Sequence, residues 1–344
     1  MDALEVRARA ILPESVAAYY GCGAGDGISV VEAAGAWDAW RLRPHVLRDV
    51  STVSTEISLL QTTLRTPVIV APSAAHRLAH VDGEVATARG AADAGSLMVL
   101  STRSTTRMAT VADVGSPWWM QVYVLRDRGL TDEIVRQAAA HGARALVLTG
   151  DTPVVGHKPD GPVPAMPRER LLPVLEGRED EVLLDQADDV TVADIQRLAE
   201  LSGLPVLVKG VLRGDDARAC VQAGAAGVVV SNHGGRQLDA AVPSAWALPE
   251  VAAALTGSGA VVLVDGGIRT GRHVLAALAL GAHAVLVGRP VLWALAVAGA
   301  DGVASLIGSL TDQTRHALAL AGCSAVSDSA PDLLWHPDGR GRSV

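Results

Sequence analysis

Eight short apolar segments recur along the chain, each of a length suited to one buried strand. They occupy residues 67–74, 97–102, 118–124, 144–151, 205–210, 227–234, 260–267 and 284–290. Ala-rich stretches with helical spacing, such as "GEVATARGAADAG" and "GRHVLAALALGA", lie between them. Eightfold alternation of such strands with helices predicts an α/β fold, a closed parallel (β/α)8 TIM barrel. A doubly wound open sheet is the alternative that this pattern leaves open.

Three regions lie outside the repeat. Residues 1–60 hold an amphipathic helix followed by "YYGCGAGDG", and we expect them to form an N-terminal helical cap on one barrel end. Residues 152–190 form the longest connection, with six prolines and an acidic second half. A connection of this length in a compact domain predicts a lid after the fourth strand. With residues 325–344 as a C-terminal tail, we expect one domain over 1–344.

The composition narrows the class of protein. A hydrophobic content of 49% is enough for a large core, and the net charge of −8 gives no support for a nucleic-acid surface. The three cysteines lie outside any CxxC pair, so neither a disulfide framework nor a metal site is indicated. The first residues lack the apolar core of a signal peptide, and no uninterrupted apolar run has membrane-spanning length. We expect a cytoplasmic protein without nucleic-acid or membrane partners.

Lysine is almost absent from the chain. There are 27 arginines but only two lysines, Lys158 and Lys209. This ratio suggests a coding bias that replaces lysine with arginine wherever either serves. Both lysines are therefore candidates for positions at which an arginine would not serve.

Polar residues gather at the carboxyl ends of the predicted strands. In chain order these are Ser73, Ser101, Gln121 with Tyr123, Thr149 with Asp151, Lys209, Ser231 with His233, Asp265, and Gly288 with Arg289. Any one of them could be a solvated loop residue, but the carboxyl rim is the active face of such barrels. The glycine-rich turns "DGGIR" (265–269) and "GRP" (288–290) free backbone N–H groups to hold a phosphate. The rim therefore predicts an active site with a phosphorylated ligand.

Several motifs together indicate a family. "SNHGGRQLD" (231–239), "LPVLVKG", "VLVDGGIR", "ALALGA" and "VLVGRPV" resemble the FMN-dependent 2-hydroxy acid oxidases and dehydrogenases, which include glycolate oxidase, lactate oxidase and mandelate dehydrogenase. The likeness runs from "LPESVAAYYGCGAGD" to "LAGC" and covers nearly the whole chain. It implies FMN as cofactor, a small 2-hydroxy acid as substrate, and a homotetramer.

The resemblance also implies a cofactor site. The residues it places against the flavin ring are Pro72, Ser73, Ala74, Ser101, Gln121 and Thr149. It places Lys209 at the N1–C2 carbonyl edge with Ser231 nearby, and it assigns the ribityl chain and phosphate to Asp265, Gly266, Gly267, Arg269, Gly288 and Arg289. A compact cation beside N1 would stabilise the negative charge of the reduced flavin. This gives one of the two lysines a role.

The same resemblance implies the substrate chemistry. It makes His233 the base, Asp151 the acid that supports the imidazolium, and Arg236 an anchor for the substrate carboxylate. Tyr19 and Tyr123 match the two pocket tyrosines of the family. The alternatives are a structural histidine at 233 and a tyrosine at 19 that only plugs the barrel mouth.

Two positions depart from the family pattern. The family usually carries an arginine after the fourth strand, in a run such as "GRR", whereas this chain has "GHKPDG" with Lys158. Arg103, in "STRST", stands where glycolate oxidase-like members have an aromatic residue. We predict that Arg103 takes over part of the substrate anchoring; the alternative is a solvent-facing loop arginine.

Three functions follow from these observations. The first is oxidation of an L-2-hydroxy acid to the 2-oxo acid, with O2 or another electron acceptor. The second is an FMN-dependent isomerase or oxidase acting on a peptide or natural-product substrate, favoured by Lys158 and Arg103. The third is a barrel that only binds a ligand, against which the intact set of His233, Arg236, Lys209 and Tyr123 argues. The residues leave the substrate and the acceptor open.

Overall fold

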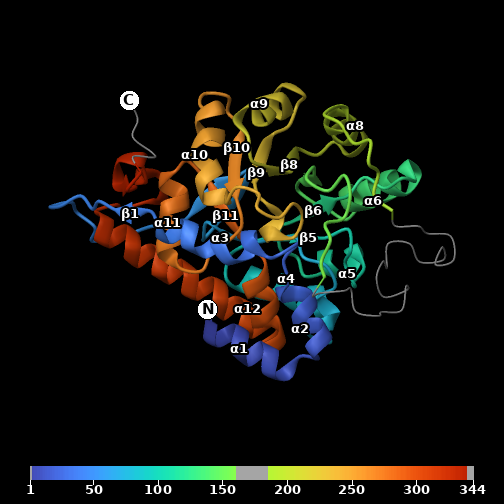
Figure 1. The fold of residues 1–344 in the computed structure, drawn as a ribbon, viewed down its shortest axis with the longest axis horizontal. Coiled ribbons are helices and arrows are strands. Elements are labelled where there is room, and N and C mark those ends of the chain that lie inside the picture. Colours follow the sequence, from blue (N-terminus) through green and yellow to red (C-terminus); the bar gives the residue numbers. More distant parts are fainter. Residues whose placement is uncertain (1, 160–184, 339–344) are drawn as a thin grey trace.

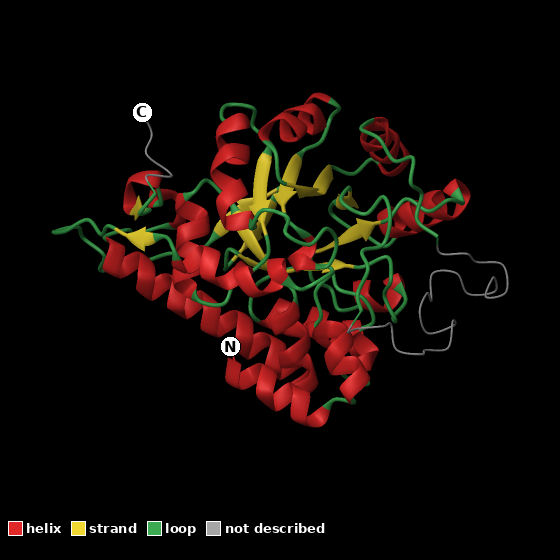
Figure 2. Ribbon diagram, in the orientation of Figure 1, coloured by secondary structure: helices red, strands yellow, loops and turns green. Residues whose placement is uncertain are grey.

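A closed barrel of eight parallel strands forms the centre of the protein (Figures 1 and 2). The computed structural model describes residues 2–159 and 185–338. The strands are β4 (Val68–Val70), β5 (Met98–Leu100), β6 (Trp118–Val122), β7 (Leu146–Thr149), β8 (Val206–Val211), β9 (Gly227–Val230), β10 (Val261–Val264) and β11 (Ala284–Val287). Strand β11 pairs with β4 and closes the barrel. Each strand coincides with one predicted segment, so the barrel is confirmed and the open sheet is excluded.

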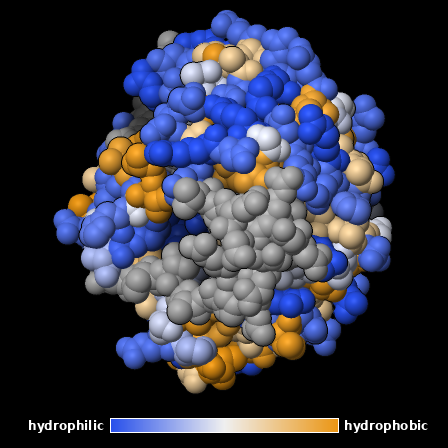
Figure 3. Space-filling view, turned by 90° about the vertical axis from the view of Figure 1, so that its right-hand side faces the viewer, coloured by the Kyte–Doolittle hydropathy of each residue, from blue (hydrophilic) through white to orange (hydrophobic). Residues whose placement is uncertain are grey.

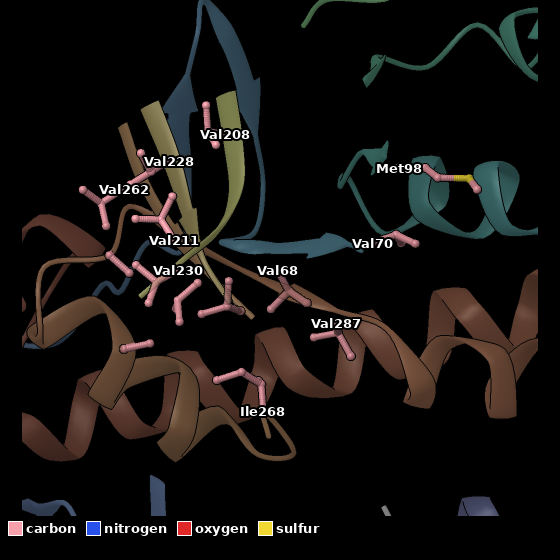
Figure 4. Packing of buried hydrophobic residues seen from close by; sticks show 14 of the residues in the cluster. Val68, Val70, Met98, Val208, Val211, Val228, Val230, Val262, Ile268 and Val287 are labelled. Carbon is pink, nitrogen blue, oxygen red and sulfur yellow. The ribbon is translucent and has the colours of Figure 1, made fainter. Parts of the chain in front are cut away.

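The strands are apolar throughout because both of their faces are buried. Ile69, Val99 and Trp119 belong to a cluster inside the barrel, and none of them is exposed. Their neighbours along the chain point outward, as alternation along a strand requires. Figure 4 shows Val68, Val70, Val228 and Val230 among these outward-packing residues. A parallel sheet covered by helices gives this continuous apolar run.

Helices surround the barrel. They are α4 (Gly83–Asp93), α5 (Met108–Ala112), α6 (Arg128–Ala140), α8 (Ala193–Ser202), α9 (Gly214–Gln222), α10 (Ser244–Ala254), α11 (Gly271–Ala279) and α12 (Arg289–Ala321). Side-chain caps begin two of them: Asp127 accepts from Gly129 N and Leu130 N, and Thr270 accepts from His273 N. At least one of these helices connects each barrel strand to the next strand along the chain.

Helix α12 is long and apolar enough, by length and composition, to cross a membrane. Half of its apolar window is buried, and it packs against α1 (Asp2–Ile11), α4 and α11. It is also interrupted, because Ala298 and Gly299 have non-helical backbone angles. These contacts are those of a helix that belongs to the barrel's own outer layer.

The segment predicted as a cap is divided between both barrel ends. Helices α2 (Glu14–Gly21) and α3 (Ile28–Asp38) lie at the carboxyl end, where Tyr20 Oη donates to Ala75 O at 2.7 Å. Strands β2 (Ile57–Leu59) and β3 (Thr62–Leu64) form a hairpin. Leu59 and Leu64 join the cluster inside the barrel. The hairpin therefore closes the amino end.

The C-terminal segment is anchored as far as it is described. Two short turns, Val326–Asp328 and Pro331–Leu333, lead to β12 (Leu334–Trp335), which pairs with β1 (Arg41–Leu42). Most of the predicted lid, residues 160–184, lies outside the described residues. The segment that follows it, from residue 185, is bonded to the end of β6, since Ala187 N donates to Val124 O at 2.8 Å.

The outer face that carries α6 and α8 is mainly hydrophilic, with apolar residues in small separate groups (Figure 3). Ion pairs join these two helices: Arg128 Nη1 lies 2.6 Å from Asp194 Oδ1, and Arg197 Nη1 lies 2.5 Å from Asp132 Oδ1. Partly exposed pairs of this kind contribute little to stability. The barrel core, rather than this face, therefore carries most of the stabilisation.

Candidate active site

A single cavity at the carboxyl rim collects nearly all the residues that the sequence singled out. Its lining includes Tyr19, Pro72, Ser73, Ala74, Ser101, Arg103, Gln121, Tyr123, Thr149, Lys158, Lys209, His233, Arg236, Asp265, Gly266, Gly267, Arg269, Gly288 and Arg289. Asp151 and Ser231 lie just behind this lining, in contact with His233 and Lys209. Arg103 and Lys158 thus belong to the cavity, and Arg103 is not a solvent-facing loop residue.

The polar cluster after β9 is held in an unusual backbone shape. His233 begins a tight turn (His233–Gly235) at φ +57°, and Gly234 and Gly235 follow at +61° and +73°. The His233 N–H donates to Ser231 Oγ at 3.0 Å. A side chain at Gly235 would come within 2.8 Å of Val30 N on α3. The two glycines therefore permit both the left-handed turn and the close approach of α3.

His233 is paired with Asp151. Its Nδ1 lies 3.0 Å from Asp151 Oδ1 and 3.2 Å from Oδ2. Burial and the charge of Lys209 lower the pKa of His233, although Asp151 acts in the opposite direction. Burial alone would raise the pKa of Asp151, but His233 and Lys209 hold it below its usual value. A neutral imidazole that donates from Nδ1 to the carboxylate leaves Nε2 as its acceptor towards the cavity.

A bulge in β8 makes room for this pair. The register between β8 and β9 shifts between Lys209 and Val211. Gly210 lies at the bulge with φ +106°, and a side chain there would overlap the side chain of Asp151. Gly210 was not among the site residues expected from the sequence, where "VKGV" reads as ordinary strand. A bulge next to a site re-aims the neighbouring side chains.

Lys209 is a buried cation at the floor of the cavity. Its Nζ donates to Ser231 Oγ at 2.9 Å and lies 3.1 Å from Asp265 Oδ2. Burial would lower the pKa of Lys209, but Asp265 and Asp151 together raise it, so the lysine stays charged. The second oxygen of Asp265 is buried without a partner among the described residues. An orphaned acceptor of this kind fits a hydroxyl-bearing chain such as ribityl.

A polar wall is built from the ends of β5, β6 and β7. Gln121 Nε2 donates to Thr149 Oγ1 at 2.9 Å, while its Oε1 accepts from Ser101 Oγ at 3.2 Å. Thr102 N also donates to this Oε1, at 3.0 Å. These bonds fix the amide orientation of a side chain that is almost fully buried. The wall offers fixed donors and acceptors to the edge of a flat heteroaromatic ring.

The glycine turns after β10 and β11 form the remaining side. Gly266 and Gly267 have φ of +88° and +76°, and a side chain at Gly267 would overlap Ala33 O on α3. Gly288 precedes the first turn of α12, whose N-terminus opens at the cavity. Free N–H groups at a helix N-terminus attract a phosphate. Together with the orphaned Asp265 oxygen and Lys209, this cradle fits FMN.

Arg289 has a second role that the sequence analysis did not foresee. Its Nε, Nη1 and Nη2 donate to the backbone carbonyls of Tyr20 (3.1 Å), Gly234 (2.8 Å) and Cys22 (2.9 Å). Burial and then the neighbouring charges of Arg236 and Arg269 lower its pKa to about 10. Arg289 therefore connects the C-terminal end of α2 to the turn that carries His233.

Three cations and two tyrosines form the outer part of the cavity. Arg236 Nη1 donates to Tyr19 O at 2.8 Å, and the Arg236 Cζ lies 5.3 Å from the Tyr19 ring centroid. Arg103 Cζ lies 5.6 Å from the Tyr123 ring centroid. Lys158 Nζ donates to Gly156 O at 2.8 Å. Burial, followed by Arg236, lowers the pKa of Lys158, and Arg103 adds to this shift.

Gln186 also lines the cavity and was absent from the expected site. In the amide orientation that satisfies both of its ends, it accepts from Arg103 Nη2 at 3.3 Å and donates to Thr152 O at 3.1 Å. It lies on the chain that returns from the long connection, where the sequence shows no periodicity. Sequence patterns offered no signal for its position.

Comparisons with known proteins agree with this architecture. Residues 8–336 match the family described as FMN-dependent dehydrogenase. An L-lactate oxidase from Nostoc sp. is 44% identical, with 92% of each chain covered, and a 4-hydroxymandelate oxidase from Amycolatopsis orientalis is 41% identical, with 94% of each covered. A crystal structure of mandelate oxidase with (S)-4-hydroxymandelic acid is 40% identical and has a TM-score of 0.90, with 97% of each chain covered.

A (β/α)8 barrel with a phosphate cradle, a buried lysine and a His–Asp pair on its carboxyl rim defines a flavin-binding oxidoreductase. The chain belongs to the FMN-dependent dehydrogenase family, within its group of 2-hydroxy acid oxidases.

Proposed function

We propose that this protein oxidises an L-2-hydroxy acid to the 2-oxo acid, with His233 as the base. The observation that carries the proposal is the contact between His233 Nδ1 and Asp151, which leaves Nε2 as an acceptor towards the cavity. General bases must lie within hydrogen-bond reach of the proton they remove, and a neutral imidazole suits this task near neutral pH.

The lining residues have the chemistry to hold FMN in two parts. Pro72, Ser73, Ala74, Ser101, Gln121 and Thr149 would hold the ring, with Lys209 and Ser231 at one edge; Asp265, Gly266, Gly267, Arg269, Gly288 and Arg289 would hold the ribityl chain and phosphate. When bound, FMN supplies the acceptor for the two electrons that leave the substrate, and O2 or another carrier accepts them in turn. The buried charge of Lys209 favours added negative charge beside it.

The protein's own residues perform the remaining steps. Arg236 and Lys158 bind the substrate carboxylate, and Tyr123, partly buried at the cavity wall, positions the reacting hydroxyl. His233 Nε2 takes a proton from the substrate. Asp151, held ionised by its neighbours, stabilises the imidazolium that results. Enclosure by the two tyrosines strengthens these charged contacts by excluding water.

Relatives support this assignment. One is named L-lactate oxidase and another 4-hydroxymandelate oxidase, and the neighbouring mandelate oxidase was crystallised with (S)-4-hydroxymandelic acid. Lactate and 4-hydroxymandelate are both 2-hydroxy acids. The proposal extends, by family resemblance, to a homotetramer, which light scattering of the purified holoenzyme tests. It also extends to a cytoplasmic location, expected from the sequence pattern.

The direct test is to record the colour of the purified protein and then to mix it anaerobically with a panel of L-2-hydroxy acids. Loss of flavin absorbance with at least one acid supports the oxidase. A yellow protein that no acid bleaches would instead favour an isomerase or an oxidase of a peptide or natural product. The departures from the family pattern at Lys158 and Arg103 favour this alternative. A colourless and inert protein would favour a ligand-binding barrel.

A further inference from the structure

The cavity carries more positive charge than a simple 2-hydroxy acid can balance. Lys209 is paired with Asp265, and Arg269 and Arg289 lie at the cradle assigned to the phosphate. Arg103, Lys158 and Arg236 remain at the outer part. Within the described part of the chain, none of these three has a carboxylate within ion-pair distance.

The partners of these three cations are neutral. Arg236 donates to backbone carbonyls, Lys158 donates to Gly156 O, and Arg103 donates to the amide oxygen of Gln186. Two of them also lie over tyrosine rings, Arg103 over Tyr123 and Arg236 over Tyr19. All three side chains are only partly exposed, so their mutual repulsion is weakly screened.

The cations face one shared space from two sides. Arg103, Lys158 and Arg236 line the same cavity, and the charges of Arg236 and Arg103 both lower the pKa of Lys158. Arg236 follows β9, whereas Arg103 follows β5 and sits beside the ring of Tyr123 at the end of β6. In the proposed function, one carboxylate is bound by Arg236 and Lys158. It leaves the guanidinium of Arg103, on the other side, without an anion.

We propose that Arg103 binds a second carboxylate on the substrate, so that the substrate is a 2-hydroxy dicarboxylate. This inference rests on the proposed 2-hydroxy acid oxidation and specifies its substrate class. The planar fork of an arginine suits a carboxylate, and Gln186 fixes the direction of that fork by accepting one of its N–H groups. A charge in a partly dry site needs such a partner, because an uncompensated charge there is costly.

Matched acids separate the second carboxylate from chain length. L-malate and L-2-hydroxybutanoate have the same four-carbon chain and differ only in the terminal carboxylate, as do L-2-hydroxyglutarate and L-2-hydroxypentanoate at five carbons. With the wild-type holoenzyme, we expect kcat/KM to favour the diacid in at least one pair by about 10- to 150-fold, the value of one charged hydrogen bond. No preference for the diacid in either pair overturns the proposal.

Variants locate the preference. R103M should remove most of the diacid preference, and R103K should restore part of it. K158M should weaken both acids of a pair alike, since Lys158 serves the shared carboxylate. R136M removes a positive charge from the exposed side of α6 and should leave the preference as in wild type. A diacid preference that survives R103M overturns the role of Arg103.

A binding measurement keeps this test separate from catalysis. Succinate and butanoate lack the hydroxyl group, so neither can be oxidised, and their dissociation constants follow from the shift of the flavin spectrum. Tighter binding of succinate in wild type, lost in R103M, supports the dicarboxylate site even if no hydroxy acid reduces the flavin. Equal binding of both acids, alongside rapid flavin reduction by a monocarboxylate, contradicts the inference and leaves the oxidase intact.

Discussion

His233 and Asp151 lie 82 positions apart in the chain, yet His233 Nδ1 is 3.0 Å from Asp151 Oδ1. They follow β9 and β7, which flank β8, and the missing side chain of Gly210 in the β8 bulge gives the carboxylate its place. The pair therefore depends on strand order and on one glycine, as well as on the residues that form it.

Asp151→Asn tests this pair through pH. The substitution removes the charged partner of the imidazolium, so we expect kcat/KM to fall by roughly 10- to 150-fold, the value of one charged hydrogen bond. Asp151 raises the pKa of His233 against the lowering by burial and Lys209, so its loss lowers that pKa further. Because the base acts when neutral, the acidic limb of the pH profile should move to lower pH. A limb that stays in place or moves to higher pH would show that Asp151 does not act on His233.

Lys209→Met tests the buried cation. It leaves Asp265 buried without a counter-charge, and breaking one side of a buried pair costs about 3–5 kcal/mol. We expect weaker FMN binding, a lower flavin midpoint potential, and a lower free energy of unfolding in denaturant titration. The double variant Lys209→Met/Asp265→Asn, which removes both charges, should recover part of the stability. An unchanged potential in the FMN-bound single variant would place Lys209 away from the flavin.

Gly267→Ala tests the close approach of α3 to the cradle. Gly142 provides the control, since its φ of +80° resembles the +76° of Gly267 and a side chain there would meet no atom within 4 Å. Both alanines carry the left-handed strain of about 1–2 kcal/mol. Gly267→Ala adds an overlap with Ala33 O, worth about 1–3 kcal/mol more. Urea unfolding should show this difference, and equal losses in the two variants would argue against the close packing.

Arg289→Lys tests the connection between the N-terminal segment and the His233 turn. A lysine keeps the charge but cannot reach three carbonyls that a guanidinium spans. Hydrogen exchange of the holoenzyme should increase around residues 20–24 and 233–236. Arg213→Lys, in an exposed pair with Asp215, is the control and should leave these amides as they are. Wild-type protection in Arg289→Lys would mean that other contacts hold the segment.

The strands and the rim residues could be predicted because each of these two sequence patterns has a single physical cause. A parallel barrel buries both strand faces, which makes segments such as 227–234 apolar throughout, and it gathers all carboxyl ends on one rim. Lys209 and His233 were therefore found from position and residue type. The contacts of Arg103 with Tyr123 and Gln186 are long-range, however, and local patterns carry no information on them.

Backbone features were the hardest to foresee. Gly210 occupies a bulge inside a run that reads as regular strand, and the three carbonyls bound by Arg289 belong to segments joined only in the folded chain. The division of residues 2–64 between the two barrel ends likewise depends on contacts that form only in the folded chain. In the sequence, Leu59 and Leu64 are indistinguishable from other apolar hairpin residues. Only the structure shows that they pack against the barrel interior.

The role of His233 is tested most directly by anaerobic stopped-flow reduction of the flavin in His233→Asn. The acid that reduces the wild-type flavin most rapidly serves as substrate for both proteins. Loss of a general base typically lowers the rate by about 10²–10⁴-fold. We therefore expect the variant to retain FMN and to reduce it more slowly by about this factor. Reduction within about tenfold of wild type, with FMN bound, would contradict His233 as the base.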